Sequence, residues 1–212
     1  DLYHELPFGL LYGKTLVGSA ESMDRYFYEA EIMNREMPEL TGLNIVQELS
    51  QFLNRNIKSA QKGYKEYTTG TVRIYAPGKG GLHAHAETEF IKFLPEFEDI
   101  RAQIDISSQV NYLLILQQAD NGGNLVLYDL DWEHTPEKLK ENQTFYDHYT
   151  HREDIIKKYA QQQIFLDTGD LLVFNGVEIW HAVQEIYGNT NRITFAGFIA
   201  KLKGNDQYVL YN

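Results

Sequence analysis

GDLLVFNGVEIWHAVQEIYGNTNRITFAGF, residues 169–198, alternates β-rich runs with glycine- and asparagine-containing turns. Short runs of apolar and β-branched residues bounded by such turns are typical of strands in an all-β architecture. Two polar side chains, His181 and Arg192, lie on different predicted strands of this stretch. The stretch therefore predicts a β-rich fold that carries polar groups on separate strands.

Similar β-rich runs fill the chain from about residue 67 to its end, except for the polar residues 135–160. Before them, residues 22–37 and 41–57 place apolar side chains at helical spacing. Helices followed by at least six strands predict a double-sheet barrel flanked by helices. We expect a mainly β (α+β) double-stranded β-helix, a jelly-roll or cupin-like barrel with N-terminal supporting helices.

We expect residues 1–212 to form a single domain. Residues 1–66 are the expected helical support, residues 67–212 the barrel core, and residues 135–160 a helical or lid-like insertion. A length of 212 residues suits one sizeable core.

Composition excludes several classes of protein. Cysteine is absent, which excludes disulfides, zinc–thiolate sites and iron–sulfur clusters. A formal charge of −11 disfavours nucleic acid and anionic lipid as partners. Neither a membrane-spanning apolar run nor a secretory signal is visible, so we expect a cytoplasmic protein. The first residue is Asp1, which leaves an upstream segment open, and the oligomeric state is open too.

GLHAHAETEF, residues 81–90, places four polar side chains at every second position: His83, His85, Glu87 and Glu89. In a strand these side chains share one face, and a solvated face is the ordinary interpretation of such alternation. His181 on a distant predicted strand changes the interpretation. Two histidines and one carboxylate form a facial triad that holds iron(II) and leaves about three positions open for other ligands.

The chain resembles the iron(II)/2-oxoglutarate-dependent oxygenases in four motifs. These are Tyr75…Gly78…His85-x-Glu87, GGNLVLYDLDW, GDLLVFNG…WH and Arg192-x-Thr194. The resemblance runs from about residue 8 to the C-terminus. It is closest to the branch that contains the aliphatic halogenases of hapalindole-type indole alkaloids. Those enzymes carry glycine where this chain has Glu87, a carboxylate of the kind that hydroxylases use.

The resemblance implies a role for each motif residue. His85, Glu87 and His181 would bind iron, although His83 is an alternative first ligand. Arg192 and Thr194 would bind the far carboxylate of 2-oxoglutarate. Further interpretations place Tyr112 and Gln109 beside 2-oxoglutarate, and Arg73, His83 and Trp180 beside the substrate. The alternatives are ordinary barrel packing for Tyr112 and Gln109, a surface ion pair for Arg73, and a wall position for Trp180.

The resemblance also implies the reaction. A dioxygenase with iron(II), 2-oxoglutarate and O2 would abstract hydrogen from an unactivated C–H bond of a small molecule in specialised or amino-acid metabolism. Hydroxylation is the expected outcome, and desaturation and oxidative cyclisation are the alternatives. A non-catalytic metal- or ligand-binding cupin-like barrel is a second hypothesis, but such a barrel has no need of Arg192-x-Thr194. A halogenase is a third, which Glu87 disfavours because it fills the position that a halide needs.

Overall fold

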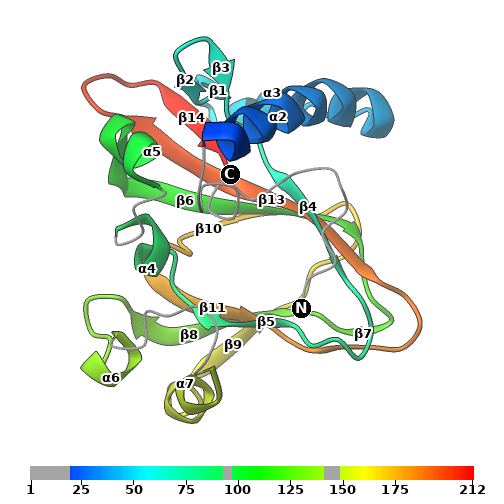
Figure 1. Cartoon of the computed structure of the whole chain (residues 1–212). Coiled ribbons are helices and arrows are strands. Elements are labelled where there is room, and N and C mark those ends of the chain that lie inside the picture. The colour runs from blue at the N-terminus through cyan, green and yellow to red at the C-terminus, as the bar shows by residue number, and fades with distance from the viewer. Residues whose placement is uncertain (1–19, 93–96, 141–148) are drawn as a thin grey trace.

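Two β-sheets lie one over the other in the computed structural model, which describes residues 20–92, 97–140 and 149–212 (Figure 1). The six-stranded sheet has the order β1 (Ile57–Ser59), β14 (Tyr208–Tyr211), β13 (Arg192–Leu202), β6 (Ile104–Gln117) and β10 (Leu171–Phe174), with β4 (Thr71–Tyr75) also paired to β13. The four-stranded sheet has the order β5 (Leu82–His85), β11 (Ile179–Val183), β8 (Leu125–Asp131) and β9 (Gln161–Ile164). Two facing sheets of mostly antiparallel strands form the expected jelly-roll barrel.

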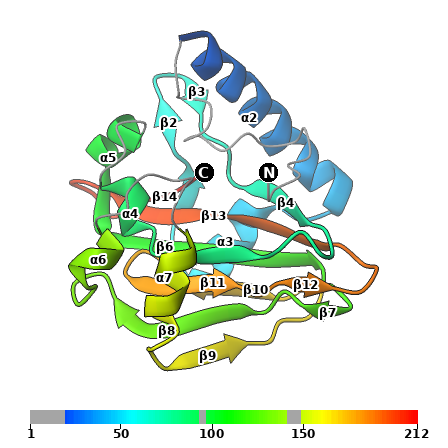
Figure 2. The same ribbon diagram turned by 60° about the horizontal axis from the view of Figure 1, so that its bottom comes forward.

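Short elements complete the described part of the chain. Two further two-stranded sheets pair β7 (Asn121–Gly122) with β12 (Ile186–Tyr187) and β2 (Gln61–Lys62) with β3 (Lys65–Glu66). The helices are α2 (Ala20–Thr41), α3 (Ile45–Leu53), α4 (Thr88–Ile91), α5 (Glu98–Gln103), α6 (Glu137–Lys140) and α7 (Tyr149–Ile156). Figure 2 shows α7 beside the four-stranded sheet, far from α2. No helix in these described ranges is long and apolar enough to cross a membrane.

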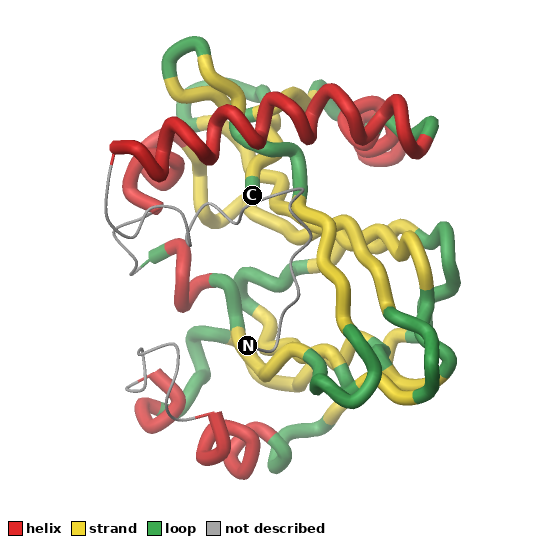
Figure 3. Tube along the Cα trace, turned by 45° about the vertical axis from the view of Figure 1, so that its right-hand side comes forward, coloured by secondary structure: helices red, strands yellow, loops and turns green. Residues whose placement is uncertain are grey.

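Helices α2 and α3 cover the outer face of the six-stranded sheet (Figure 3). Met33 and Leu49, one from each helix, are buried against Phe195 of β13 and its neighbours. The Asn44 side chain caps α3 by accepting from the Gln47 amide at 3.1 Å. Helix α3 then ends at Leu53, earlier than the helical pattern over residues 41–57 predicts. Asn54 adopts a left-handed φ of 50°, and the chain continues as β1, parallel to β14.

Strand β13 forms the centre of the six-stranded sheet because it pairs with β4 and β14 along one edge and β6 along the other. Its side chains alternate between two environments. Arg192 and Thr194 line a cavity inside the barrel, whereas Phe195 and Ile199 pack toward the helices. The alternation therefore separates the polar interior of the barrel from its apolar support.

Gly197 of β13 lies where the Tyr112 side chain crosses the sheet to donate its hydroxyl to the Thr69 carbonyl. A Cβ at Gly197 would lie 2.8 Å from that carbonyl oxygen and 2.9 Å from the Tyr112 Oη. We expect Gly197→Ala to lower the free energy of unfolding by about 1–3 kcal/mol, since overpacking forces the sheet to shift. Denaturant unfolding measures this. Lys58→Ala, at an exposed strand position, is the control and should change it by less than about 0.5 kcal/mol. An unchanged value for Gly197→Ala would show that the sheet adjusts freely there.

Candidate metal centre and cosubstrate site

A β-bulge in β5 decides which polar side chains enter the barrel. Leu82 pairs with Val183 and His85 pairs with His181, so the segment of β5 between these pairs is one residue longer than that of β11. His85 therefore faces His181 inside the barrel. His83 instead lies beside α7, with its Nδ1 3.2 Å from the Glu153 Oε1.

Strand β5 ends at His85, which corrects the expectation of one continuous strand face over residues 83–89. Glu87 has helical dihedral angles, φ −64° and ψ −22°, and precedes the single turn of α4. That turn sends Glu89 away from the barrel to a buried ion pair with Arg152. Two of the four alternating residues thus enter the barrel, and two contact α7.

The side chains of His85, Glu87 and His181 converge in the interior, and all three are buried. The Glu87 Oε1 lies 3.6 Å from the His85 Nε2 and 3.9 Å from the His181 Nε2. All candidate ligand atoms lie within 4.8 Å of one another. Two donors bound at about 2.1 Å to one ion are at most about 4.2 Å apart, so Glu87 can share an ion with either histidine. The donor set fits iron(II).

Backbone carbonyls orient both histidines. The His85 Nδ1 lies 2.7 Å from the His83 carbonyl oxygen, and the His181 Nδ1 lies 3.0 Å from the Ile179 carbonyl oxygen. Each Nδ1 donates its proton there, which leaves the Nε2 lone pair for a metal. In both rings, the nitrogen that can bind a metal is therefore Nε2, which lies nearer Glu87.

Asn111 of β6 is a member of the site that the sequence analysis missed. Its Nδ2 donates to the Glu87 Oε1 at 3.1 Å, and its side chain packs on Gly176, where a Cβ would lie 2.8 Å from the Asn111 Oδ1. The sequence signal that could have pointed to Asn111 is its amide side chain within the largely apolar run VNYLLIL. Asn111 belongs to the six-stranded sheet and binds the Glu87 carboxylate from there, opposite the strands that carry the histidines.

The charge states of Glu87 and His181 suit a cation. Burial raises the pKa of Glu87, but the hydrogen bond and charge of His85 outweigh it, so the pKa lies below the ordinary value. Burial and the charge of His85 lower the pKa of His181 to about 3. For His85, burial lowers the pKa, but the bond to Glu87 outweighs it, and the net direction is upward. An ionised carboxylate and a neutral His181 are the forms that bind metal.

Arg192 lies in the same cavity and is 1% exposed. Its Nε has no hydrogen-bond partner, and no carboxylate in the described ranges forms an ion pair with it. Burial lowers the pKa of Arg192, partly opposed by Tyr75, whose ring centroid lies 5.6 Å from the Cζ. An uncompensated buried guanidinium is costly, so the position favours an anion. Gly123, with φ 71°, makes room for it, because a Cβ there would lie 2.6 Å from the Arg192 Cδ.

Glu87 and His181 line the same cavity as Arg192. Thr194 and Arg73, which pair across β13 and β4, line it too. The positive charge of Arg73 helps lower the pKa of Glu87, which places the guanidinium near the trio. The volume is about 40 Å³, much less than the roughly 300–1,000 Å³ of ligand pockets. Cosubstrate and substrate must therefore displace side chains to enter.

Four residues predicted to contact the cosubstrate or the substrate make polar contacts within the protein. Tyr112 lines the cavity, but its hydroxyl is donated to the Thr69 carbonyl. The Gln109 Oε1 accepts from the Tyr211 hydroxyl. His83 contacts Glu153, as described above. Trp180 packs on the face of β11 away from His181, and its Nε1 donates to the Thr135 Oγ1 at 2.8 Å.

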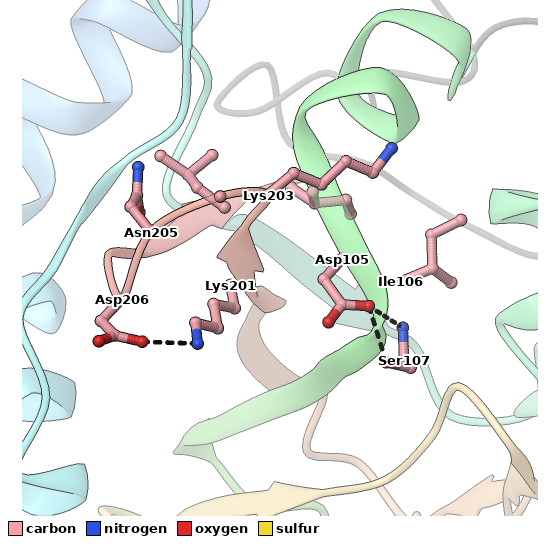
Figure 4. A pocket seen from close by; sticks show the side chains of 10 residues that line it. Asp105, Ile106, Ser107, Lys201, Lys203, Asn205 and Asp206 are labelled. Atoms are coloured by element: carbon pink, nitrogen blue, oxygen red, sulfur yellow. Dashed lines mark hydrogen bonds and ion pairs between the residues drawn. The ribbon is translucent and has the colours of Figure 1, made fainter.

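A larger open groove of about 680 Å³ lies at the other end of β6 and β13 (Figure 4). Two of its acidic groups have partners within the groove: the Lys201 Nζ lies 2.6 Å from Asp206, and the Ser107 hydroxyl donates to Asp105 at 2.7 Å. None of the residues that line it is a histidine. We therefore place the functional site in the smaller barrel cavity.

Comparison with known proteins agrees with this geometry. The whole chain, residues 1–212, matches the family described as carrier-protein-independent halogenase WelO5. A comparison with curated protein sequences gave no match. The structure is similar to that of an N-substituted L-amino acid dioxygenase from Burkholderia ambifaria AMMD, with a TM-score of 0.65 and 16% identity over 97% of this chain and 78% of that one. For the complex of that enzyme with alpha-KG, the TM-score is 0.64 at 16% identity over 98% and 78% of the chains.

The structural likeness shows the fold and confirms the double-stranded β-helix expected from the sequence. The family match covers the whole chain and confirms the resemblance, the enzyme class and the cofactors. The chain belongs to the WelO5 family, and with it to the iron(II)/2-oxoglutarate-dependent oxygenases, enzymes that use iron(II), 2-oxoglutarate and O2.

Proposed function

We propose that this enzyme abstracts hydrogen from an unactivated C–H bond of a small molecule and hydroxylates it, in specialised or amino-acid metabolism. One observation supports this most: the Glu87 Oε1 lies 3.6 Å and 3.9 Å from two histidine nitrogens in a buried cavity that also holds Arg192. Iron(II) with 2-oxoglutarate and O2 supplies the oxidising chemistry that protein side chains lack. The chain supplies ligands, orientation and exclusion of water.

His85, Glu87 and His181 are the proposed iron ligands. The two imidazoles bind through Nε2, because each Nδ1 is held by a backbone carbonyl. Glu87 contributes the negative charge, and Asn111 keeps its carboxylate turned toward the histidines. Three protein ligands leave about three positions for cosubstrate and oxygen.

Arg192 and Thr194 are the proposed receptor for the far carboxylate of 2-oxoglutarate. Both are buried on the same face of β13, two residues apart. The guanidinium offers parallel donors to a carboxylate, and the Thr194 hydroxyl can add another. The buried positive charge also explains how a chain with a formal charge of −11 attracts a dianion.

Two rival functions fit the site less well. The family contains a halogenase, and a halide needs an open ligand position. Glu87 stands in that position, which favours hydroxylation. A barrel that only binds a ligand has no use for an arginine buried at 1% exposure without a counter-ion beside the metal trio.

Arg73 is the proposed contact for an anionic group of the substrate. It lines the cavity from β4, next to Thr194, and its charge acts on both Glu87 and His181. The structurally similar dioxygenase acts on N-substituted L-amino acids, which carry a carboxylate. Release of succinate, screened against N-substituted amino acids, free amino acids and alkaloids, tests the proposed function. Failure of every class to raise succinate above the substrate-free rate would contradict it.

The register of β5 predicts which histidine binds metal. We expect His85→Ala to abolish iron binding and succinate formation, because it removes an Nε2 beside Glu87. His83→Ala should retain measurable iron, since its ring lies beside Glu153. Anaerobic iron(II) titration, followed by the visible charge-transfer band on adding 2-oxoglutarate, measures both. Equal loss of iron in the two variants would contradict the assignment.

The position of Arg192 leads to a prediction about how much 2-oxoglutarate the enzyme requires. We expect Arg192→Ala to raise the concentration of 2-oxoglutarate needed, since losing one partner of a buried charged pair costs about 2–5 kcal/mol, roughly 30-fold to several thousand-fold. Arg192→Lys should recover only part, because a point charge does not reproduce the planar fork. Dependence of succinate formation on 2-oxoglutarate measures the effect, with the exposed Arg25→Ala as control. An unchanged requirement in Arg192→Ala would place the cosubstrate elsewhere.

The proposed role of Glu87 as an iron ligand leads to a prediction about the reaction type. We expect the wild-type enzyme to give no chlorinated product at any chloride concentration. Glu87→Gly should lose most hydroxylation and admit chloride at the metal, because it removes one ligand and one negative charge. Chlorination should be weak at best, since groups that orient a halide are not in place. Product mass spectrometry with and without chloride measures this. Full oxygenase activity in Glu87→Gly would show that Glu87 is not a ligand.

A further inference from the structure

Two consecutive residues of α7, Arg152 and Glu153, contact neighbours in sequence of all three proposed iron ligands. Arg152 pairs with Glu89, two residues after Glu87. Glu153 pairs with His83, two residues before His85. The Arg152 Cζ lies 6.0 Å from the ring centroid of Trp180, the residue before His181. One helical turn therefore touches every segment that carries a proposed ligand.

The Arg152–Glu89 pair is the stronger of the two ion pairs. The Arg152 Nη1 donates to the Glu89 Oε2 at 3.1 Å, and the Nη2 donates to the Oε1. Both side chains are buried, with 7% and 5% of their surface exposed. Bidentate charge-assisted bonds away from water fix both position and direction. The Glu153–His83 pair is about one-third exposed and contributes less.

The segment that carries His85 and Glu87 gains from such support, because its own elements are short. Strand β5 has four residues and a bulge, and α4 has four residues. No side chain caps the start of α4 at Glu87. Within α7, Ile156 is buried in the cluster that also contains Trp180 and Ala84. Apolar packing thus joins α7 to the sheet, and the Arg152–Glu89 pair joins α7 to α4.

We propose that Arg152 is a positioning residue for the metal centre, and that docking of α7 and binding of iron are coupled. Arg152 holds Glu89, and with it the α4 turn that begins after Glu87, at a fixed distance from the Trp180–His181 segment. Coupling is reciprocal: a docked α7 raises metal affinity, and a bound metal stabilises the docked α7. The proposal rests on the ligand set of the proposed function. It gives α7, a described part of the polar residues 135–160, a structural task at the site.

The two tryptophans of the chain report on this junction directly. Trp132 and Trp180 are stacked, with ring centroids 6.3 Å apart and planes at 11°. Metal-free Arg152→Gln should therefore show altered tryptophan emission. Its affinity for iron(II), titrated anaerobically by tryptophan fluorescence and calorimetry, should fall about 10- to 100-fold. Arg25→Gln, which removes an arginine from the exposed pair with Glu29, is the matched control and should leave both unchanged.

Thermal unfolding with and without iron(II) separates positioning from general stabilisation. If Arg152 only stabilised the fold, its substitution would lower the Tm of the metal-free protein but leave the affinity for iron(II) and the metal-induced rise in Tm unchanged. That result overturns the proposal. Loss of affinity with a smaller metal-induced rise supports it. Arg152→Lys keeps the positive charge but lacks the planar guanidinium, so its affinity for iron(II) should fall to an intermediate extent. This variant tests the proposal even when Arg152→Gln does not fold. Wild-type affinity in Arg152→Lys then overturns the proposal.

The same titration distinguishes this inference from the proposed function. Absence of iron binding in the wild-type protein would overturn the proposed function together with the coupling. Wild-type iron binding that persists at full affinity in Arg152→Gln would overturn the coupling alone.

Discussion

One extra residue in β5 determines the polar interior of this barrel. The bulge opposite β11 lets Leu82 and His85 both face inward, although they are three positions apart. Without it, the period of two along a strand would send His85 to the outer face with Ala84 inside. The pairing of His85 with His181 follows from that register.

The polar and charged groups of the interior come from both sheets. His85 and His181 belong to β5 and β11 of the lower layer in Figure 1, Glu87 follows β5, and Asn111 and Arg192 belong to β6 and β13 of the upper layer. Under the proposed function, a cation at the trio offsets Glu87, and an anion at Arg192 offsets the buried guanidinium.

Much of this arrangement could be predicted from the sequence. The turn signals and strand periodicity indicated the jelly-roll, and the family motifs indicated which residues gather at the cavity. The bulge could not be predicted, because alternation over residues 83–89 is equally consistent with one flat strand. Asn111 and Arg152 were missed for a related reason. Their roles depend on contacts across 24 and 63 positions of the chain, and nothing local in the sequence marks such partners.

Glu87 occupies backbone that every amino acid adopts easily. With φ −64° and ψ −22°, it lies in the ordinary helical region, outside the β-ladder, and its amide donates to the Gly176 carbonyl whatever the side chain. Exchange of the side chain at this position therefore demands no change of strand register or turn. Under the proposed function, a single codon change at Glu87 would therefore alter the metal ligands while the scaffold remained under separate selection.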